Sequence, residues 1–359
     1  MKRKLTFIAL VIVFIGIIAT VVIISNAHNE KIDTNIDLSN VPSALNPDTK
    51  EFIIKAGVNT PGLENDGWFF NYGMNYLRKK STFLNIKEKG FDHVRVPIDL
   101  RLFYDEKNNS LNEKLMKKYD RIIDLAEWAG LYVIVDFHGW YDISPAKSED
   151  HDLFLKLWRL VAERYSNRSN YVIFELMNEP SLKTAPSFSL NILQREAVEA
   201  IRETNPTRLI LCAAPDGNQP WLLNEVSIIE EDKNLAVAVH IYHPGDFTHQ
   251  GYWWAGREPN KQAKLTEEML AELQWNLNET KKFMEKTGIP VIINEFGMNL
   301  EISDKQDRYT YLGTITEFCN KNNIPWTIWR YNWKEMGVYG KGKWKEDIVD
   351  VLFLRDVKD

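Results

Sequence analysis

Two glutamates that each follow a short apolar run are the residues of this sequence best suited to chemistry. Glu179 lies within Asn178-Glu179-Pro180 at the end of one run, and Glu295 ends the run that begins at residue 291. A single glutamate after a strand is most simply a solvated loop residue. Two glutamates that face the same space can form the pair that retaining hydrolysis of a glycosidic bond requires. One acts as a proton donor and the other as a nucleophile, about 5 to 5.5 Å apart.

Other polar and aromatic residues stand at the ends of further apolar runs. They are Arg95, His138, Asn178, His240, Tyr242 and Trp329. In a barrel of parallel strands the active site lies at the carboxyl ends of the strands, where the side chains of all these residues would meet. We therefore expect them to form one site with the two glutamates.

Eight short runs rich in β-branched and aromatic residues are the elements that would position this site. They span 52–58, 91–96, 132–137, 171–176, 208–213, 235–240, 290–294 and 326–329. Amphipathic segments such as 111–126 and 153–161 alternate with them, which indicates parallel strands joined by helical crossovers. Eight such units predict an α/β fold, a single (β/α)8 TIM barrel, and no glycine-rich dinucleotide-binding fingerprint follows the first run.

A set of motifs at these positions resembles glycoside hydrolase family 5, the cellulase family, from about residue 54 to residue 353. The motifs are Gly90-Phe91, Val94-Arg95-Val96-Pro97, Asp136-Phe137-His138-Gly139, Asn178-Glu179-Pro180, His240-Ile241-Tyr242, Asn294-Glu295-Phe296-Gly297 and Trp329. The stretches 240–254 and 337–339 resemble the endo-β-1,4-glucanases of that family. Gly139 departs from the many members that have a second histidine there, which leaves specificity at the neighbouring subsites open.

The resemblance implies that Glu179 is the acid/base and Glu295 the nucleophile. Arg95 would keep Glu295 ionised, because a neighbouring guanidinium lowers the pKa of a carboxyl group. The alternative role of Arg95 is a structural salt bridge inside the barrel. Tyr242 would donate its hydroxyl to Glu295, whereas Glu179 needs a drier or more negative setting to keep its proton.

The remaining site residues suit sugar binding better than metal binding. His138 and His240 can bond sugar hydroxyls, Asn178 the 2-hydroxyl, and Trp329 can stack on the apolar face of a sugar ring. No zinc-like spacing of histidines or cysteines accompanies the two histidines, so we expect no metal and no cofactor. Other tryptophans fit core or loop packing as well as sugar binding, namely Trp68, Trp140, Trp221, Trp253, Trp254 and Trp333, and Trp128 and Trp158 are predicted core residues.

The predicted activity is endo-acting hydrolysis of a β-linked polysaccharide. Cellulose-type or mixed-linkage β-1,4-glucan is the first choice, and mannan or glucomannan stays open because substrate choice depends on contacts to single hydroxyls. A transglycosidase shares the covalent step. A non-catalytic carbohydrate-binding barrel is the alternative from another class, and the presence of both glutamates argues against it.

The first residues of the chain differ in character from the rest. Lys2, Arg3 and Lys4 precede the uncharged apolar run 5–24, which is long enough to cross ~30 Å of hydrocarbon. Small residues follow at 25–27, so cleavage as a signal peptide and retention as an anchor stay equally open. The predicted organisation is therefore a signal or anchor at 1–27, a linker at 28–48 and a catalytic domain at 49–359, located outside the cell or on its surface.

Composition limits the partners of this domain. The chain of 359 residues is 44% hydrophobic, and its formal net charge of −6 is spread among interspersed charges of both signs. No basic stripe suited to nucleic acid is present, and we expect a monomer. Cys212 and Cys319 are predicted to be buried free thiols, with a disulfide open if the compartment is oxidising.

Overall fold

The computed structural model describes residues 37–63, 67–139, 147–181, 183, 186–229, 231–258 and 261–357, and only the backbone of 67–69. The predicted signal or anchor, residues 28–36 of the predicted linker, the Trp68 side chain and Trp140 lie outside these residues. Within them, no helix is both long enough and apolar enough to cross a membrane.

Eight parallel strands in the described residues close a barrel, which confirms the predicted (β/α)8 fold. Their order around the barrel is β1-β10-β9-β8-β7-β6-β5-β2. The strands are β1 Ala56–Asn59, β2 His93–Ile98, β5 Tyr132–Phe137, β6 Val172–Glu175, β7 Ile210–Ala213, β8 Leu235–Ile241, β9 Val291–Phe296 and β10 Trp326–Ile328. Every strand residue is buried, as expected for parallel strands covered on both faces.

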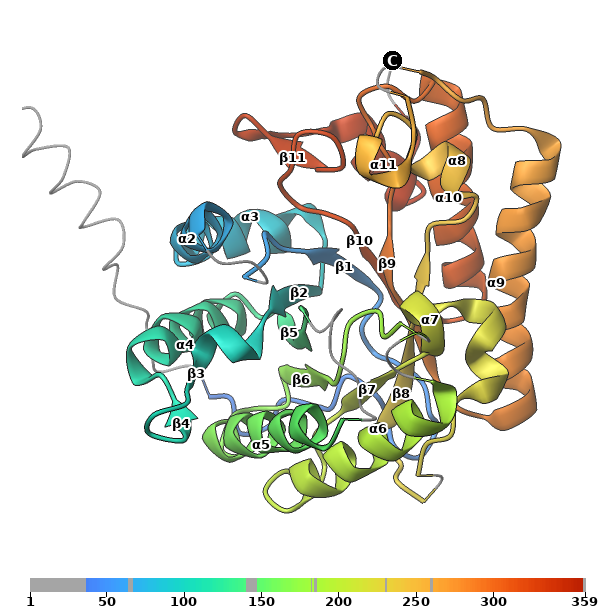
Figure 1. Cartoon of the computed structure of the whole chain (residues 1–359). Coiled ribbons are helices and arrows are strands. Elements are labelled where there is room, and N and C mark those ends of the chain that lie inside the picture. The colour runs from blue at the N-terminus through green and yellow to red at the C-terminus, as the bar shows by residue number, and fades with distance from the viewer. Residues whose placement is uncertain are drawn as a thin grey trace, which may run out of the picture.

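Helices surround the barrel and place its loops (Figure 1). The helices are α2 Gly67–Tyr76, α3 Lys80–Lys89, α4 Glu113–Trp128, α5 Ser148–Arg164, α6 Ser187–Arg202, α9 Glu267–Thr287, α10 Lys305–Lys321 and α11 Glu346–Leu352. Side-chain caps fix where α4, α9 and α10 begin, because Asn112, Thr266 and Asp304 each accept a backbone N–H of the first turn.

Short elements fill the loops between them. They are η1 Leu100–Phe103, β3 Tyr104–Asp105, β4 Ser110–Leu111, α7 Pro215–Asn218, η2 Pro220–Glu225, α8 Gly245–Thr248, η3 Trp253–Ala255, β11 Tyr339–Gly340 and β12 Lys343–Trp344. Most of these elements follow the carboxyl ends of strands. They therefore build the rim at which the predicted site residues lie.

The amino end of the barrel is closed by the chain that precedes β1. Ala44 and Leu45 are fully buried in a cluster that includes Ile134 and Leu211 from inside the barrel, and Leu45 forms an antiparallel bridge with Phe52. The predicted domain limits are not tested directly. Two residues of the 28–48 range nevertheless pack in the core of the folded domain.

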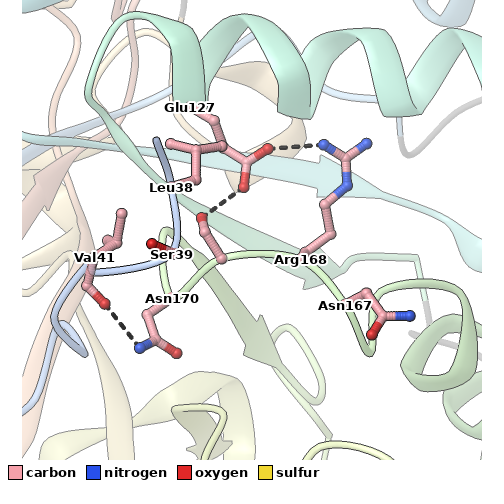
Figure 2. A pocket seen from close by; sticks show the side chains of 8 residues that line it. Leu38, Ser39, Val41, Glu127, Asn167, Arg168 and Asn170 are labelled. Atoms are coloured by element: carbon pink, nitrogen blue, oxygen red, sulfur yellow. Dashed lines mark hydrogen bonds and ion pairs between the residues drawn. The ribbon is translucent and has the colours of Figure 1, made fainter. Parts of the chain in front are cut away.

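A polar cavity of about 470 Å³ lies beside this amino-end segment and holds none of the predicted site residues (Figure 2). Within it, Glu127 accepts hydrogen bonds from Ser169 at 2.7 Å and from Arg168 at 2.7 Å, and Asn170 donates to the carbonyl of Val41 at 2.9 Å. These contacts tie the segment before β1 to the loop before β6, and that loop to α4.

Core predictions outside the site hold with one exception. Trp158 is fully buried, and Cys212 and Cys319 are buried free thiols, as predicted. Trp128 is only partly buried, because it ends α4 at the surface, where the Lys80 ammonium lies 4.9 Å from its ring.

Candidate active site

The residues predicted from the strand ends meet at the carboxyl end of the barrel. Arg95, His240 and Glu295 lie on β2, β8 and β9, and the other residues follow the last residue of a strand. These are His138 after β5, Asn178 and Glu179 after β6, Tyr242 after β8 and Trp329 after β10. Contacts among them, given below, join all of them into one site.

His240 lies between the two predicted catalytic carboxyls. Its Nδ1 is 2.8 Å from Glu179 Oε1 and 3.8 Å from Glu295 Oε2. One oxygen of each glutamate and one histidine nitrogen all lie within 4.8 Å of one another. Two carboxyls from strands on opposite sides of β7 and β8 thus face the same small space.

Arg95 is the hub of a buried polar network. Its hydrogen-bond and ion-pair partners are Asn59, Asp136, Glu175, Asn178 and Glu295. Two nearly parallel bonds of 2.7 and 2.9 Å join it to Glu175, and a third contact joins its Nη1 to Glu295 Oε1. This bidentate geometry holds the guanidinium rigidly against the predicted nucleophile.

Electrostatics keep Arg95 charged in this fully buried position. Burial by itself lowers the pKa of Arg95, but the carboxyls of Asp136, Glu175 and Glu295 outweigh burial and raise it well above its usual value. The pKa of Glu175 is raised, because loss of solvation outweighs its attraction to Arg95. Arg95 is therefore a permanent cation in a strongly acidic cluster.

Sequence reasoning missed three members of this network. Asp136 and Glu175 sit within the strands β5 and β6, and Asn59 ends β1, all of them fully buried. A signal was present, because a charged residue inside a strand buried on both faces needs an internal partner. Only the barrel shows that the partner is the same arginine for all three.

Glu179 is held in an unusual backbone conformation. Its φ of 43° is left-handed, and its backbone N–H donates to Asn218 Oδ1 at 2.9 Å, while Asn218 Nδ2 donates to the carbonyl of Ala238. Sequence reasoning did not single out Asn218. Its amide fixes the backbone of the carboxyl that the resemblance marks as acid/base.

Burial shifts the pKa values of Glu179, His240 and Tyr242 in this site. Loss of solvation raises the pKa of Glu179 against the opposing pull of His138 and Arg95. Burial lowers the pKa of His240 to about 4, so this imidazole is neutral at neutral pH. Burial and the nearby Glu295 raise the pKa of Tyr242 well above its usual value, so its hydroxyl remains a donor, and it donates to Glu295 Oε2 at 3.1 Å.

Comparison with known proteins settles the family of this chain. Residues 45–335 match the family model Cellulase (glycosyl hydrolase family 5). The chain belongs to glycosyl hydrolase family 5. It is therefore a glycoside hydrolase, similar to endo-β-1,4-glucanases.

Individual family 5 relatives agree over most of the chain. Endoglucanase C of Acetivibrio thermocellus is 25% identical over 349 residues, covering 84% of this chain and 98% of its own. Cellulose synthase subunit Z of Clostridioides difficile has a crystal structure that is 29% identical, with a TM-score of 0.74 over 83% of this chain and 99% of its own. Cel5A of Thermotoga maritima, in complex with cellobiose, is 26% identical, with a TM-score of 0.74 over 84% and 97% of the two chains.

Trp329 and His138 form one wall of this family 5 site. Their rings are nearly parallel, at 16° and with centroids 5.9 Å apart, and His138 Nδ1 lies 2.7 Å from Asp136. Arg330, which the sequence left without a role, stacks on Trp329 at 4.9 Å and on Trp333 at 5.3 Å. It therefore packs against the rings of both tryptophans.

The backbone explains the departure at Gly139. Its φ is +122°, and a Cβ there would lie 2.9 Å from the carboxyl of Asp99. A histidine at this position would need a different backbone and a displaced Asp99.

One group of side chains in the described ranges has the make-up of a metal site, and it contains the two predicted catalytic carboxyls. Glu179, His240 and Glu295 offer three ligand atoms. The guanidinium of Arg95 already contacts Glu295 and opposes a second cation beside it.

Proposed function

We propose that this protein is a retaining endo-β-1,4-glucanase that cleaves its substrate by double displacement. The observation that carries the proposal is the approach of the Glu179 and Glu295 carboxyls, whose oxygens lie within 4.8 Å of each other. Direct attack on a sugar fits carboxyls about 5 to 5.5 Å apart, whereas inversion through a water needs about 6.5 to 9.5 Å.

In the first step, Glu295 attacks the anomeric carbon while Glu179 gives its proton to the leaving oxygen. The glycosidic C–O bond breaks as the bond from carbon to the Glu295 oxygen forms. Arg95 holds the Glu295 carboxyl in position for attack, and Tyr242 donates to its second oxygen throughout. The raised pKa of Glu179 keeps its proton available for the leaving group.

In the second step, the ionised Glu179 takes a proton from water, whose oxygen attacks the same carbon and releases Glu295. Neutral His240 holds the Glu179 carboxyl in place through both steps. A sugar hydroxyl in place of water would give transglycosylation by the same chemistry, so product analysis separates the two activities.

The names of similar proteins favour β-1,4-glucan as the substrate. Two of them are endoglucanase C of Acetivibrio thermocellus and cellodextrinase A of Ruminococcus flavefaciens. Cel5A of Thermotoga maritima, 25 to 26% identical, has structures with cellobiose and with mannotriose. Mannan and glucomannan therefore remain the second choice.

The test is an assay of the full-length chain against carboxymethyl cellulose, barley glucan, mannan and xylan, with NMR of the first anomer released. We expect reducing sugar from the glucans and an initial β-anomer, with activity absent from Glu179→Gln and Glu295→Gln. An initial α-anomer would overturn double displacement. Release of reducing sugar from mannan alone would show that mannan is the substrate. No release from any of the four polysaccharides would support a non-catalytic barrel.

We also propose that the enzyme acts as a monomer at the cell surface or outside the cell. All the site residues come from one chain, and the apolar run 5–24 suits an anchor or a signal. The first described residues pack at the barrel end opposite the catalytic glutamates, so a tether there would leave the cleft open to polysaccharide. Protease treatment of intact cells tests the location, and light scattering tests the oligomeric state.

A further inference from the structure

We propose that the outer flank of the barrel carries a second, non-catalytic binding site for the glucan chain, built on Trp221 and Trp275. The inference rests on the proposed function for the identity of the ligand. The site lies on η2 and α9, outside the group of residues that surrounds Glu179 and Glu295.

Trp275 is exposed where its helix has no structural need for an indole. The apolar residues by which α9 packs on the barrel, Leu273, Leu277 and Phe283, are buried, whereas Trp275 is 48% exposed. Its ring stacks on Trp221 with centroids 6.1 Å apart and planes 24° from parallel. The two indoles thus form one partly exposed aromatic pair, and the C–H face of a sugar ring can stack on an exposed indole face.

Polar groups border this surface. His243 meets the Trp221 ring edge-on with centroids 4.8 Å apart, and its Nδ1 lies 3.1 Å from Glu272 Oε1. The side chains of His243 and Glu272 are 37% and 45% exposed, so both can also reach a ligand. A carboxylate and an imidazole beside an aromatic plane offer acceptors and donors for neighbouring sugar hydroxyls.

The size and polarity of the patch favour a glycan over a protein or a lipid. A stable protein interface needs about 800 Å² from each partner, far more than two indoles supply. A lipid tail would have to lie against the carboxylate of Glu272, which disfavours it. A polysaccharide needs only one or two stacked rings at each contact, and it is long enough to occupy the cleft and the flank together.

Both loops that build the patch begin at the catalytic centre. Trp221 comes three residues after Asn218, whose side chain holds the backbone of Glu179. His243 comes directly after Tyr242, whose hydroxyl donates to Glu295. A glucan that leaves the cleft over the ends of β7 and β8 would meet the patch, and two contacts with one chain strengthen binding without new chemistry.

Another exposed aromatic group is part of the cleft and does not belong to this site. Trp254 stacks on Tyr252 and contacts His249, whose ring lies 5.2 Å from that of Tyr242. Changes at Trp254 should therefore alter activity on short and long substrates alike.

The experiment compares Trp275→Ala and Trp221→Ala with Phe188→Ala in the full-length protein. Phe188 is the control, because it is an aromatic residue that is 77% exposed on α6 and belongs neither to the Trp221–Trp275 pair nor to its polar border. Binding is measured in the Glu295→Gln background, from retardation in native gels that contain barley glucan. Hydrolysis of barley glucan and of cellotetraose is measured in the active background.

We expect Trp275→Ala to weaken polymer binding about tenfold, as loss of one aromatic contact of ~1.4 kcal/mol would do. Polymer hydrolysis at low substrate concentration should fall in parallel, while cellotetraose hydrolysis and the melting temperature stay unchanged. Trp275→Tyr should restore most of the binding, and Phe188→Ala should change nothing.

Two results would overturn the inference. Unchanged retardation in Trp275→Ala would show that the flank binds no glucan, and an equal loss on polymer and cellotetraose would place Trp275 within the cleft. A wild-type protein that hydrolyses no glucan would refute the proposed function separately. Retardation of that protein in the gel would still test the flank site.

Discussion

Arg95 and Arg208 are buried at opposite ends of the barrel, and their charges are satisfied in different ways. Arg95, at the carboxyl ends, contacts the carboxyls of Asp136, Glu175 and Glu295. Arg208, just before β7 at the amino ends, is 5% exposed and contacts no carboxyl in the hydrogen bonds found for it. Its partners are Asn205 Oδ1 and the backbone carbonyls of Tyr165, Arg168, Ser169 and Val172, at 2.6 to 3.2 Å.

The difference separates a chemical site from a structural one. Carbonyl dipoles cannot change protonation state, so Arg208 can only fix the loop before β6 to the end of α5. Carboxyls can gain a proton or form a bond, so the proposed mechanism would change the environment of Arg95. Burying excess negative charge beside one cation costs stability, and this cost is typical of functional sites.

The largest effect should come from Arg95→Met. Without the guanidinium, three buried carboxyls lose their common partner, so we expect kcat/KM to fall by about a thousandfold or more. The free energy of unfolding should fall by about 3 to 5 kcal/mol. Initial rates on barley glucan and urea unfolding measure the two effects, and a variant within tenfold of wild-type activity would contradict the role of Arg95.

Arg208→Met should affect stability alone. Several buried acceptors would lose their donor, so the free energy of unfolding should fall by about 3 kcal/mol. Below the melting temperature we expect kcat to stay within twofold of wild type. A large loss of activity in the fully folded variant would break the distinction between the two ends of the barrel.

Tyr242→Phe should produce a smaller loss at the catalytic end. The change removes one hydrogen bond to a charged carboxyl, a bond worth about 1.5 to 3 kcal/mol. We expect kcat to fall by about 10- to 100-fold. The glycosyl-enzyme should accumulate, and mass spectrometry would detect it. A kcat of Tyr242→Phe equal to that of the wild-type protein would show that the Tyr242 hydroxyl has no part in the mechanism.

The pH profile should give the smallest and most specific effect. As general acid, Glu179 must be protonated, so kcat/KM should be lost as pH rises through its raised pKa and be retained below it. The pull of His138 lowers that pKa, so His138→Gln should move the basic limb upward by a fraction of a pH unit. Arg208→Met is the control and should leave the limb in place.

Local pattern was enough to predict the barrel and most of the residues that lie together in the candidate site. The predicted run 132–137 has the same first and last residues as β5, and the other strands differ from the prediction by a few residues at their ends. A strand buried on both faces is mostly apolar, so polar residues that follow an apolar run indicate its carboxyl end. Glu179, His138 and Tyr242 were identified in this way.

Contacts between distant strands were beyond the reach of pattern. Asp136 and Glu175 share Arg95, and Asn218 holds Glu179 from the next loop, because the closed barrel brings β2, β5, β6 and β7 together. The stack of Trp221 on Trp275 likewise joins η2 to α9, between residues 54 positions apart in the chain. The order of apolar and polar residues determined which side chains face the mouth of the barrel, whereas closure of the barrel decided which of them touch, since a hydrogen bond or ion pair requires atoms within about 3 to 4 Å of each other.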